Sequence, residues 1–229
     1  MQLELEIQLI SDATFARGDG MGGVVDTEVE HDPDTGLPFI RGRVLKGLLT
    51  EECANILFAA QTSRGLARLS TAANYLFGGP GSDVFANGHL RVGAASLPAE
   101  FIKAVRTDVK AKRLQTEDVL MAFTDIRRQT SVAESGVPEE GSLRAVRVVL
   151  RNTVFVAPLT LDEPTDTALL NDAQALLAAC ALTTRRGGLG RNRGRGRLCI
   201  NLRGTASQSL DLVKTIKWFE LLVKGGVPA

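Results

Sequence analysis

The sequence predicts an α+β fold with a ferredoxin-like (RRM-like) βαββαβ core, a protruding hairpin (thumb) insertion and long flexible loops. Residues 3–10 alternate apolar and polar side chains, the pattern of a strand with one buried face. Residues 169–184 repeat apolar side chains with the period of an amphipathic helix. Such segments follow one another as strand, helix, strand, insertion, strand, helix, strand and helix, which is the order of a ferredoxin-like core with additions.

The first half of the chain supplies three elements of this core. Residues 3–10, LELEIQLI, form the first strand, and a glycine-rich loop over 11–36 follows it. A loop of that length without regular structure is typically functional or mobile. Residues 43–60 carry an i, i+3, i+4 apolar stripe and predict a helix, and a short strand is expected around 89–96.

The middle of the chain predicts the insertion. The periodic pattern breaks over residues 100–142, which begin with a run of lysines and arginines. Residues 125–143 have β-like ends and a Gly/Pro tip at 136–138, which predicts a protruding hairpin. We therefore expect a single domain over 1–229, with an inserted thumb-like region at about 100–143.

The remaining elements complete the core. Residues 144–161 are rich in Val and Leu and predict a core strand or a pair of strands. Asp166 is a suitable N-cap for the helix at 169–184. Residues 197–203, RLCINLR, predict a strand, and residues 209–224 predict a terminal amphipathic helix.

Charge is unevenly distributed along the chain. The formal net charge is only +1, so the protein is not a bulk polycation. Residues 185–203 nevertheless carry seven Arg and no acid, whereas residues 26–34 carry five acids and no Lys or Arg. This distribution suits a protein that meets a polyanion with one face; solvated charge clusters without a ligand are the alternative.

The cysteines and the apolar segments indicate a cytoplasmic protein. Cys53, Cys180 and Cys199 are far apart and form no CxxC pair, which favours buried free thiols over a zinc site. The first residues alternate instead of forming a signal-peptide core, and no stretch approaches the ~20 apolar residues of a membrane span.

The stretch RRGGLGRNRGRGR, residues 185–197, is the most unusual segment. A dinucleotide fingerprint starting at Gly188 and Gly190 would need its third glycine at Arg193, and no GxxxxGK[ST] string occurs. The segment also follows a helix and precedes a strand, the reverse of both nucleotide motifs. We interpret it as a structured polyanion clamp, in which glycine backbone and arginine forks hold the phosphates of single-stranded RNA without reading sequence.

Three cations crowd the expected start of the first helix. Arg41, Arg43 and Lys46 lie at the end of a helix where the macrodipole favours acids. Either an anion binds between these side chains and the helix N-terminus, or they point to solvent at a small cost.

Several motifs together resemble one family. "HDPDTGLPFIRGRVLKGLL" (31–49), "LFGGPG" (76–81), "GSLRAVRVV" (141–149) and "GGLGRNRGRGRLCI" (187–200) are similar, in order, to motifs of the RAMP (repeat-associated mysterious protein) superfamily, CRISPR-associated RNA-binding proteins. They resemble most the backbone subunits of type III effector complexes. The chain departs from the family at residues 41–47, where Arg-Gly-Arg-Val-Leu-Lys-Gly replaces Pro-Gly-Ser-Ser-Leu-Lys-Gly, so that arginine charge stands in for serine hydroxyls.

The resemblance implies RNA contacts and partners. The hairpin over 125–143 would press between guide and target RNA, and subunits would stack head-to-tail with other RAMP subunits and with the large subunit of the complex. The residues expected to contact RNA are Gly42, Arg43, Lys46, Arg127, Arg128, Gly188, Gly190, Arg191, Arg193 and Arg195.

The resemblance also implies a catalytic residue. Asp26 holds the place of the loop aspartate with which cleaving members cut target RNA, and its carboxylate would bind a divalent metal, expected to be magnesium, or orient the RNA 2′-hydroxyl. Asp32 and Asp34 are interpreted as turn residues. A non-catalytic guide-RNA scaffold is an alternative function, as is a guide-processing ribonuclease that uses His31; exposed loop histidines are the simpler interpretation of His31 and His89.

Overall fold

The structure is a computed structural model of the chain. It describes residues 1–18, 20, 25–79, 87–131, 134, 136–137, 139, 141–205 and 209–226. In chain order the elements are β1 (Gln2–Leu9), α1 (Gly42–Ala59), α2 (Leu66–Phe77), β2 (Leu90–Val92), α3 (Ala99–Lys110), α4 (Thr116–Phe123), β3 (Thr124–Gln129), β4 (Arg144–Val149), β5 (Val154–Leu161), α5 (Thr167–Thr183), β6 (Leu198–Gly204) and α6 (Leu212–Val223).

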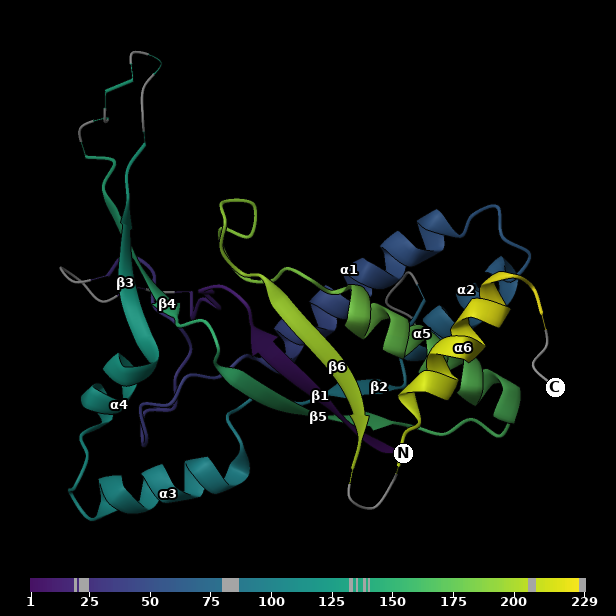
Figure 1. The fold of residues 1–229 in the computed structure, drawn as a ribbon, viewed down its shortest axis with the longest axis horizontal. Coiled ribbons are helices and arrows are strands. Elements are labelled where there is room, and N and C mark those ends of the chain that lie inside the picture. The colour runs from purple at the N-terminus through teal and green to yellow at the C-terminus, as the bar shows by residue number, and fades with distance from the viewer. Residues whose placement is uncertain are drawn as a thin grey trace.

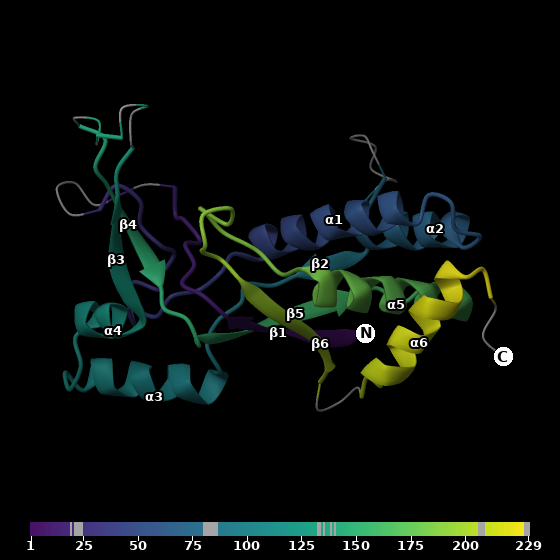
Figure 2. The same cartoon turned by 45° about the horizontal axis from the view of Figure 1, so that its top comes forward.

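The core is a four-stranded antiparallel sheet with the strand order β2-β5-β1-β6. The two crossover connections run through α1–α2 and through α5, so the order is that of a ferredoxin-like βαββαβ fold, and the predicted fold class is confirmed. Helices α1, α2 and α5 lie on one face of this sheet, and α6 packs against α5 (Figure 2).

The sequence of β1 explains how the sheet is covered. Leu3, Leu5, Ile7 and Leu9 are at most 1% exposed and face the helices, while the residues between them face the other way. The outward residues of β1, β5 and β6 include no aromatic side chain. This face therefore lacks the stacking platform with which RRM-type sheets bind bases.

The insertion between β2 and β5 contains more regular structure than the sequence analysis expected. Residues 100–142 were expected to be irregular outside the hairpin, but they include α3 and α4. Helix α3 buries only Val105 fully, so its apolar stripe is narrow and its charged residues hide the helical period. Helix α2 was also missed, although Leu69, Ala72, Ala73 and Leu76 form a regular buried stripe.

The predicted hairpin is present. Strands β3 and β4 pair antiparallel, with Thr124 opposite Val149 and Gln129 opposite Arg144, and the hairpin projects away from the core sheet (Figure 1). The segment 144–161 is a pair of strands, as one of the two predictions had it, but the strands belong to different sheets. The turn at Asn152, whose φ is 69°, separates β4 from β5.

The expected cap and two of the three expected buried thiols are found. The side chain of Asp166 accepts a hydrogen bond from the Ala168 amide at the start of α5. Cys53 and Cys180 are buried, and a hydrogen bond between their thiols lowers the pKa of Cys53 and, together with burial, raises that of Cys180. Cys199 is exposed, contrary to the expectation, because it lies on the face of β6 that points away from the helices.

A search of the described residues finds no helix with the length and apolar character that a membrane crossing requires.

Candidate nucleic-acid interface

The loop of residues 185–197 is a structured hairpin-like excursion between α5 and β6. Arg186 pairs with Arg197, and the Gly187 amide donates to the Gly196 carbonyl at 2.9 Å. At the base, the Leu198 amide donates to the Arg185 carbonyl at 2.9 Å. The loop, called the arginine loop below, therefore holds a defined backbone shape, which a clamp for a polyanion requires.

Glycines in the arginine loop are explained by the protein's own packing. Gly188 has a φ of +81°, and a Cβ there would lie 2.5 Å from the Thr14 carbonyl oxygen. Gly196 has a φ of +69°, and a Cβ there would lie 2.0 Å from the Gly187 carbonyl oxygen. Both positions require a residue without a side chain whether or not RNA binds.

The arginines of this loop differ in how they are engaged. Arg191 forms a bidentate ion pair with Glu51 of α1, at 2.8 and 2.9 Å, and this hydrogen bonding lowers the pKa of the Glu51 carboxyl. No partner for the side chains of Arg193 and Arg195 is found in the part of the chain that the structure describes. These two guanidinium groups are therefore available to a ligand.

Two of the three cations at the start of α1 are already engaged. Arg41 lies 2.5 Å from the carboxylate of Glu30, and the Lys46 ammonium donates to the Leu90 carbonyl at 3.0 Å. Arg43 is exposed and, within the described ranges, has no side-chain partner. Of this group, Arg43 is therefore the cation most available to an anion.

Gly42 is the first residue of α1 and lies against the end of β2. A Cβ at Gly42 would lie 2.1 Å from the Val92 carbonyl oxygen and 2.8 Å from Gly93. The close approach of helix and strand accounts for this glycine without an RNA contact.

Asp26 is held against strand β4 of the hairpin. Its amide donates to the Ala145 carbonyl at 2.8 Å, and its Oδ2 accepts from the Ala145 amide at 2.6 Å. The next residue, Thr27, pairs with Val146 in a parallel bridge. The side chain of Asp26 is exposed, and among the described residues nothing bonds to its Oδ1, which leaves that oxygen for a ligand.

A buried ion pair fixes the same loop to the hairpin. Glu28 and Arg147 are 3% and 8% exposed, with Arg147 Nε 2.8 and 3.0 Å from the two carboxylate oxygens. Arg147 Nη1 also donates to the hydroxyl of Thr124, at 3.3 Å, at the start of β3. The sequence does not reveal this pair for two reasons. Glu28 lies in an acidic run of the kind that is usually exposed to solvent, and its partner is 119 positions away along the chain.

Thr27, the hairpin and the arginine loop line one cavity of about 430 Å³, called the cleavage-side cavity below; Asp26 precedes Thr27 and is not itself a lining residue. The hairpin and the arginine loop rise on the same side of the molecule (Figure 1). The lining residues are Thr27, Gln129, Val146, Gly188, Leu189, Gly190, Arg191, Asn192, Arg193 and Arg195.

The two arginines predicted on the hairpin have different surroundings. Arg127 donates from Nε and Nη2 to Asp12 at 3.2 and 2.8 Å, and it also bonds to Asp125. The hydrogen bond to Asp12 raises the pKa of Arg127. Arg128 is exposed, and no partner for its side chain is found among the residues described.

The residues that line this cavity include no carboxylate, and the expected metal would have Asp26, beside the lining, as its protein ligand. Nowhere in the described ranges do three or more His, Cys, Asp or Glu side chains gather as they would around a protein-built metal centre. Magnesium is commonly bound through one or two carboxylates plus substrate phosphates and water. The exposed Oδ1 of Asp26 fits that role only if RNA supplies the other ligands.

The neighbouring acids and histidines have structural roles. Oδ1 of Asp32 accepts the amides of Asp34 and Thr35, at 2.8 and 3.2 Å, so Asp32 is a turn residue as predicted. The ring of His31 bonds to a backbone carbonyl through Nδ1, at 3.1 Å, and is not fully exposed. His89 stacks on Tyr75 with ring centroids 4.3 Å apart.

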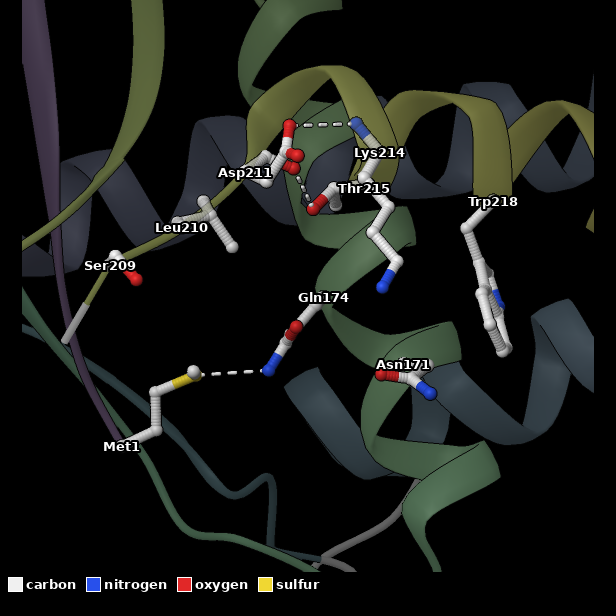
Figure 3. Close-up of a pocket in the computed structure, with 9 residues that line it drawn as sticks. All are labelled: Met1, Asn171, Gln174, Ser209, Leu210, Asp211, Lys214, Thr215 and Trp218. Carbon is white, nitrogen blue, oxygen red and sulfur yellow. Dashed lines mark hydrogen bonds between the residues drawn. The ribbon is translucent and has the colours of Figure 1, made fainter.

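Another cavity, of about 200 Å³, lies at the end of the molecule opposite the hairpin. Figure 3 shows the side chains of Lys214 and Gln174 directed into it between α5 and α6, with Trp218 at its edge. The Gln174 amide donates to the sulfur of Met1 at 3.1 Å. None of the residues predicted to bind RNA lines this cavity.

Comparison with known proteins identifies the family. A family profile described as the RAMP superfamily matches residues 6–199. The chain belongs to the RAMP superfamily. All residues predicted for RNA binding and cleavage in this RAMP protein lie within the matched segment.

Two solved structures have the same fold as this RAMP chain. A chain of the Type III-B Cmr-beta in its apo state, solved by cryo-EM, aligns with a TM-score of 0.60 and 13% identity over 93% of this chain and 98% of that one. A chain of the Type III-B Cmr-beta bound to cognate target RNA aligns with a TM-score of 0.59 and 12% identity, over 94% and 99%. No significant match is found among curated proteins.

Proposed function

We propose that this RAMP protein is a subunit of a type III CRISPR effector complex. The subunit would hold guide RNA and cleave the paired target RNA, with Asp26 as the catalytic residue. One observation carries the proposal: the projecting hairpin, the arginine loop and Thr27, the neighbour of Asp26, come from three parts of the sequence and line a single cavity. An RNA strand lying in that cavity would contact fixed positive charge and would pass beside Thr27, the residue that follows Asp26.

The proposed hold on RNA is through its backbone. Arg193 and Arg195 have no described protein partner, and their guanidinium forks match the geometry of a phosphate. The open face of the sheet offers no aromatic platform in β1, β5 or β6. Binding would accordingly tolerate any guide sequence, which a subunit that repeats along a guide requires.

Asp26 is proposed to act on the 2′-hydroxyl of the target. The hydrogen bond from the Ala145 amide fixes Oδ2, and Oδ1 has no partner among the described residues; the next residue, Thr27, lines the cavity. From there it would orient the 2′-hydroxyl toward its own phosphate, or hold a magnesium ion that neutralises charge on that phosphate. Arg193 and Arg195 would add positive charge beside the same phosphate.

The proposed partners are the guide RNA, the target RNA, further RAMP subunits stacked head-to-tail and the large subunit of the complex. The similarity to chains of Type III-B Cmr-beta assemblies, one of them bound to cognate target RNA, supports this setting. The projecting hairpin supports a role between strands, because it stands clear of the core sheet.

The test is cleavage of target RNA by complexes assembled with Asp26→Asn. The substitution removes the carboxylate charge but keeps the side chain's size, so guide occupancy should match wild type while target cleavage falls by at least about 100-fold, within the range of general acid–base effects. Asp34→Asn, in the same loop on an exposed turn, is the matched control and should cut normally. Chelation of magnesium should abolish the same cuts. Normal cutting by the Asp26→Asn complex would refute the catalytic assignment.

A non-catalytic scaffold is the second candidate, and one observation favours it. Oδ2 of Asp26 bonds to the Ala145 amide, which is a structural role for this aspartate at the base of the hairpin. A scaffold predicts that the complex holds guide RNA but makes no metal-dependent cut that depends on this subunit.

A further inference from the structure

A second cavity shares Arg195 of the arginine loop with the cleavage-side cavity. It measures about 560 Å³, within the range of roughly 300–1,000 Å³ typical of ligand sites. Its walls come from the end of β1, strand β3 of the hairpin, the turn between β4 and β5, and the arginine loop. Asp12, Arg127, Arg151 and Arg195 are its charged lining residues, three guanidinium groups against one carboxylate.

Asp12 organises this cavity. Its Oδ2 accepts two hydrogen bonds from Arg127, and its Oδ1 accepts the backbone amide of Arg151 at 3.1 Å. Its backbone carbonyl accepts the amide of Gly196, at 2.8 Å, from the arginine loop. Asp12 thus ties three walls of the cavity together, and both of its carboxylate oxygens are satisfied by the protein.

Two cations of the cavity remain available. Arg151 and Arg195 have no side-chain partner in the described part of the chain, whereas Arg127 is shared by Asp12 and Asp125. Beside Arg151 the backbone takes a left-handed turn at Asn152, with a φ of 69°, and that side chain also lines the cavity. Among the described residues no acid forms a side-chain hydrogen bond or ion pair with the guanidinium groups on the turn and on the arginine loop, although the charge of Arg151 helps to lower the pKa of Asp12.

Arg195 lies on the boundary between the two cavities and lines both of them. It is flanked by Gly194 and Gly196, with φ of +79° and +69°, so the backbone turns sharply on both sides of this residue. A strand that passes over Arg195 from the cleavage-side cavity enters the second cavity and meets Arg151.

We propose that the cavity of Asp12, Arg127, Arg151 and Arg195 binds a phosphodiester of the same single-stranded RNA that occupies the cleavage-side cavity, with Arg151 as its main ligand. This inference rests on the proposed RNA-binding function and extends it to residues that neither the motifs nor the family match single out. Asp12 is a positioning residue, because it holds Arg127 and the Arg151 backbone without facing the RNA with a free oxygen.

The test measures binding of single-stranded oligouridine to the purified chain over a series of salt concentrations. Arg151→Gln should weaken binding by about tenfold, the loss expected for a hydrogen bond to a charged group. It should also reduce the slope of log K against log salt by about 0.7, the value for one phosphate contact on a single strand. Arg151→Lys keeps the charge but loses the fork, so it should retain the slope with intermediate affinity.

Arg64→Gln is the matched control, because it removes the same charge. Arg64 is exposed between α1 and α2 and lines neither cavity. Equal effects of Arg151→Gln and Arg64→Gln would overturn the inference. So would an Arg151→Gln variant that loses binding of inorganic phosphate but keeps the RNA salt slope, because the site would then serve free anions. Wild-type protein without salt-dependent RNA binding would refute the proposed function itself, whereas continued cutting by Asp26→Asn would leave this site standing.

Discussion

Replacing Arg147 with methionine tests whether the Glu28–Arg147 pair holds the Asp26 loop to the hairpin. Both side chains are nearly inaccessible to solvent, at 3% and 8%. The guanidinium is 2.8 and 3.0 Å from the two oxygens of Glu28, whose only other described bond is from the Val29 amide at 2.9 Å. Arg147→Met would leave a buried carboxylate with one hydrogen bond and no countercharge.

The structure sets the expected magnitude. Removing one partner of a buried ion pair typically costs about 3–5 kcal/mol, whereas replacing both with apolar groups is often close to neutral. Arg147→Met should therefore lower the free energy of unfolding by about 3–5 kcal/mol, and Glu28→Met combined with Arg147→Met should recover most of that loss. The exposed pair of Arg203 and Glu6 is the control, because Arg203→Met should cost less than about 1 kcal/mol.

The assay is guanidinium unfolding followed by circular dichroism, with hydrogen exchange at the Ala145 amide as a local measurement. That amide donates to Asp26, so its protection should fall when the loop detaches from β4. An Arg147→Met variant as stable as Arg203→Met, with Ala145 still protected, would refute the reasoning.

Two further predictions concern single residues. Gly42→Ala should destabilise the protein by about 1–3 kcal/mol because its Cβ would lie 2.1 Å from the Val92 carbonyl oxygen. Gly47→Ala on the same helix is the control: its Cβ would meet nothing within 4 Å, so the change should be neutral or stabilising by up to about 1 kcal/mol. Equal melting temperatures for the two variants would contradict the close helix–strand contact. Burial raises the pKa of Asp12, but hydrogen bonds from Arg127 and from the Arg151 amide outweigh it and the net shift is downward. A lowered folded-state pKa means that the contribution of Asp12 is present above its unfolded pKa of about 3.9 and is lost as pH falls through the folded value. The difference in free energy of unfolding between wild type and Asp12→Asn, measured by denaturant unfolding, should therefore be constant near neutrality and fall toward zero below about pH 4. A difference that persists in stronger acid would argue against the Arg127 pairing.

Elements whose apolar residues repeat with the period of a strand or a helix were predictable from sequence. Strand β1 alternates in register with its buried face, so its type and approximate ends follow from the pattern. Helix α5 was also predicted, although residues 172–181 are buried on all sides except at Gln174 and do not form the one-sided stripe that the sequence indicated. Helix α3 was not predicted because it buries one residue fully and shows charge on the rest of its surface. Strand β4 was assigned to the core because residues 144–161 are rich in Val and Leu. Residues 146–149 are buried, but they pair with the Asp26 loop and with Ala13 and lie outside the main sheet.

The candidate site was predictable only in outline. The arginine loop and the position of Asp26 follow from composition and motif order, and in the structure the arginine loop and Thr27, the neighbour of Asp26, line one cavity. Sequence does not reveal that Lys46 bonds to β2, that Arg191 pairs with Glu51 or that Arg127 pairs with Asp12, because each partner is distant along the chain. These contacts decide which cations remain available to RNA.

Cleavage of target RNA by guide-loaded complexes that carry Asp26→Asn in every copy of this subunit is the most direct measurement of the central claim. Guide occupancy and target cutting are measured on the same particles, so loss of assembly is separated from loss of chemistry. The account predicts normal guide occupancy, loss of the magnesium-dependent cuts, and normal cutting with Asp34→Asn. Undiminished cutting at every site by the Asp26→Asn particles would contradict it.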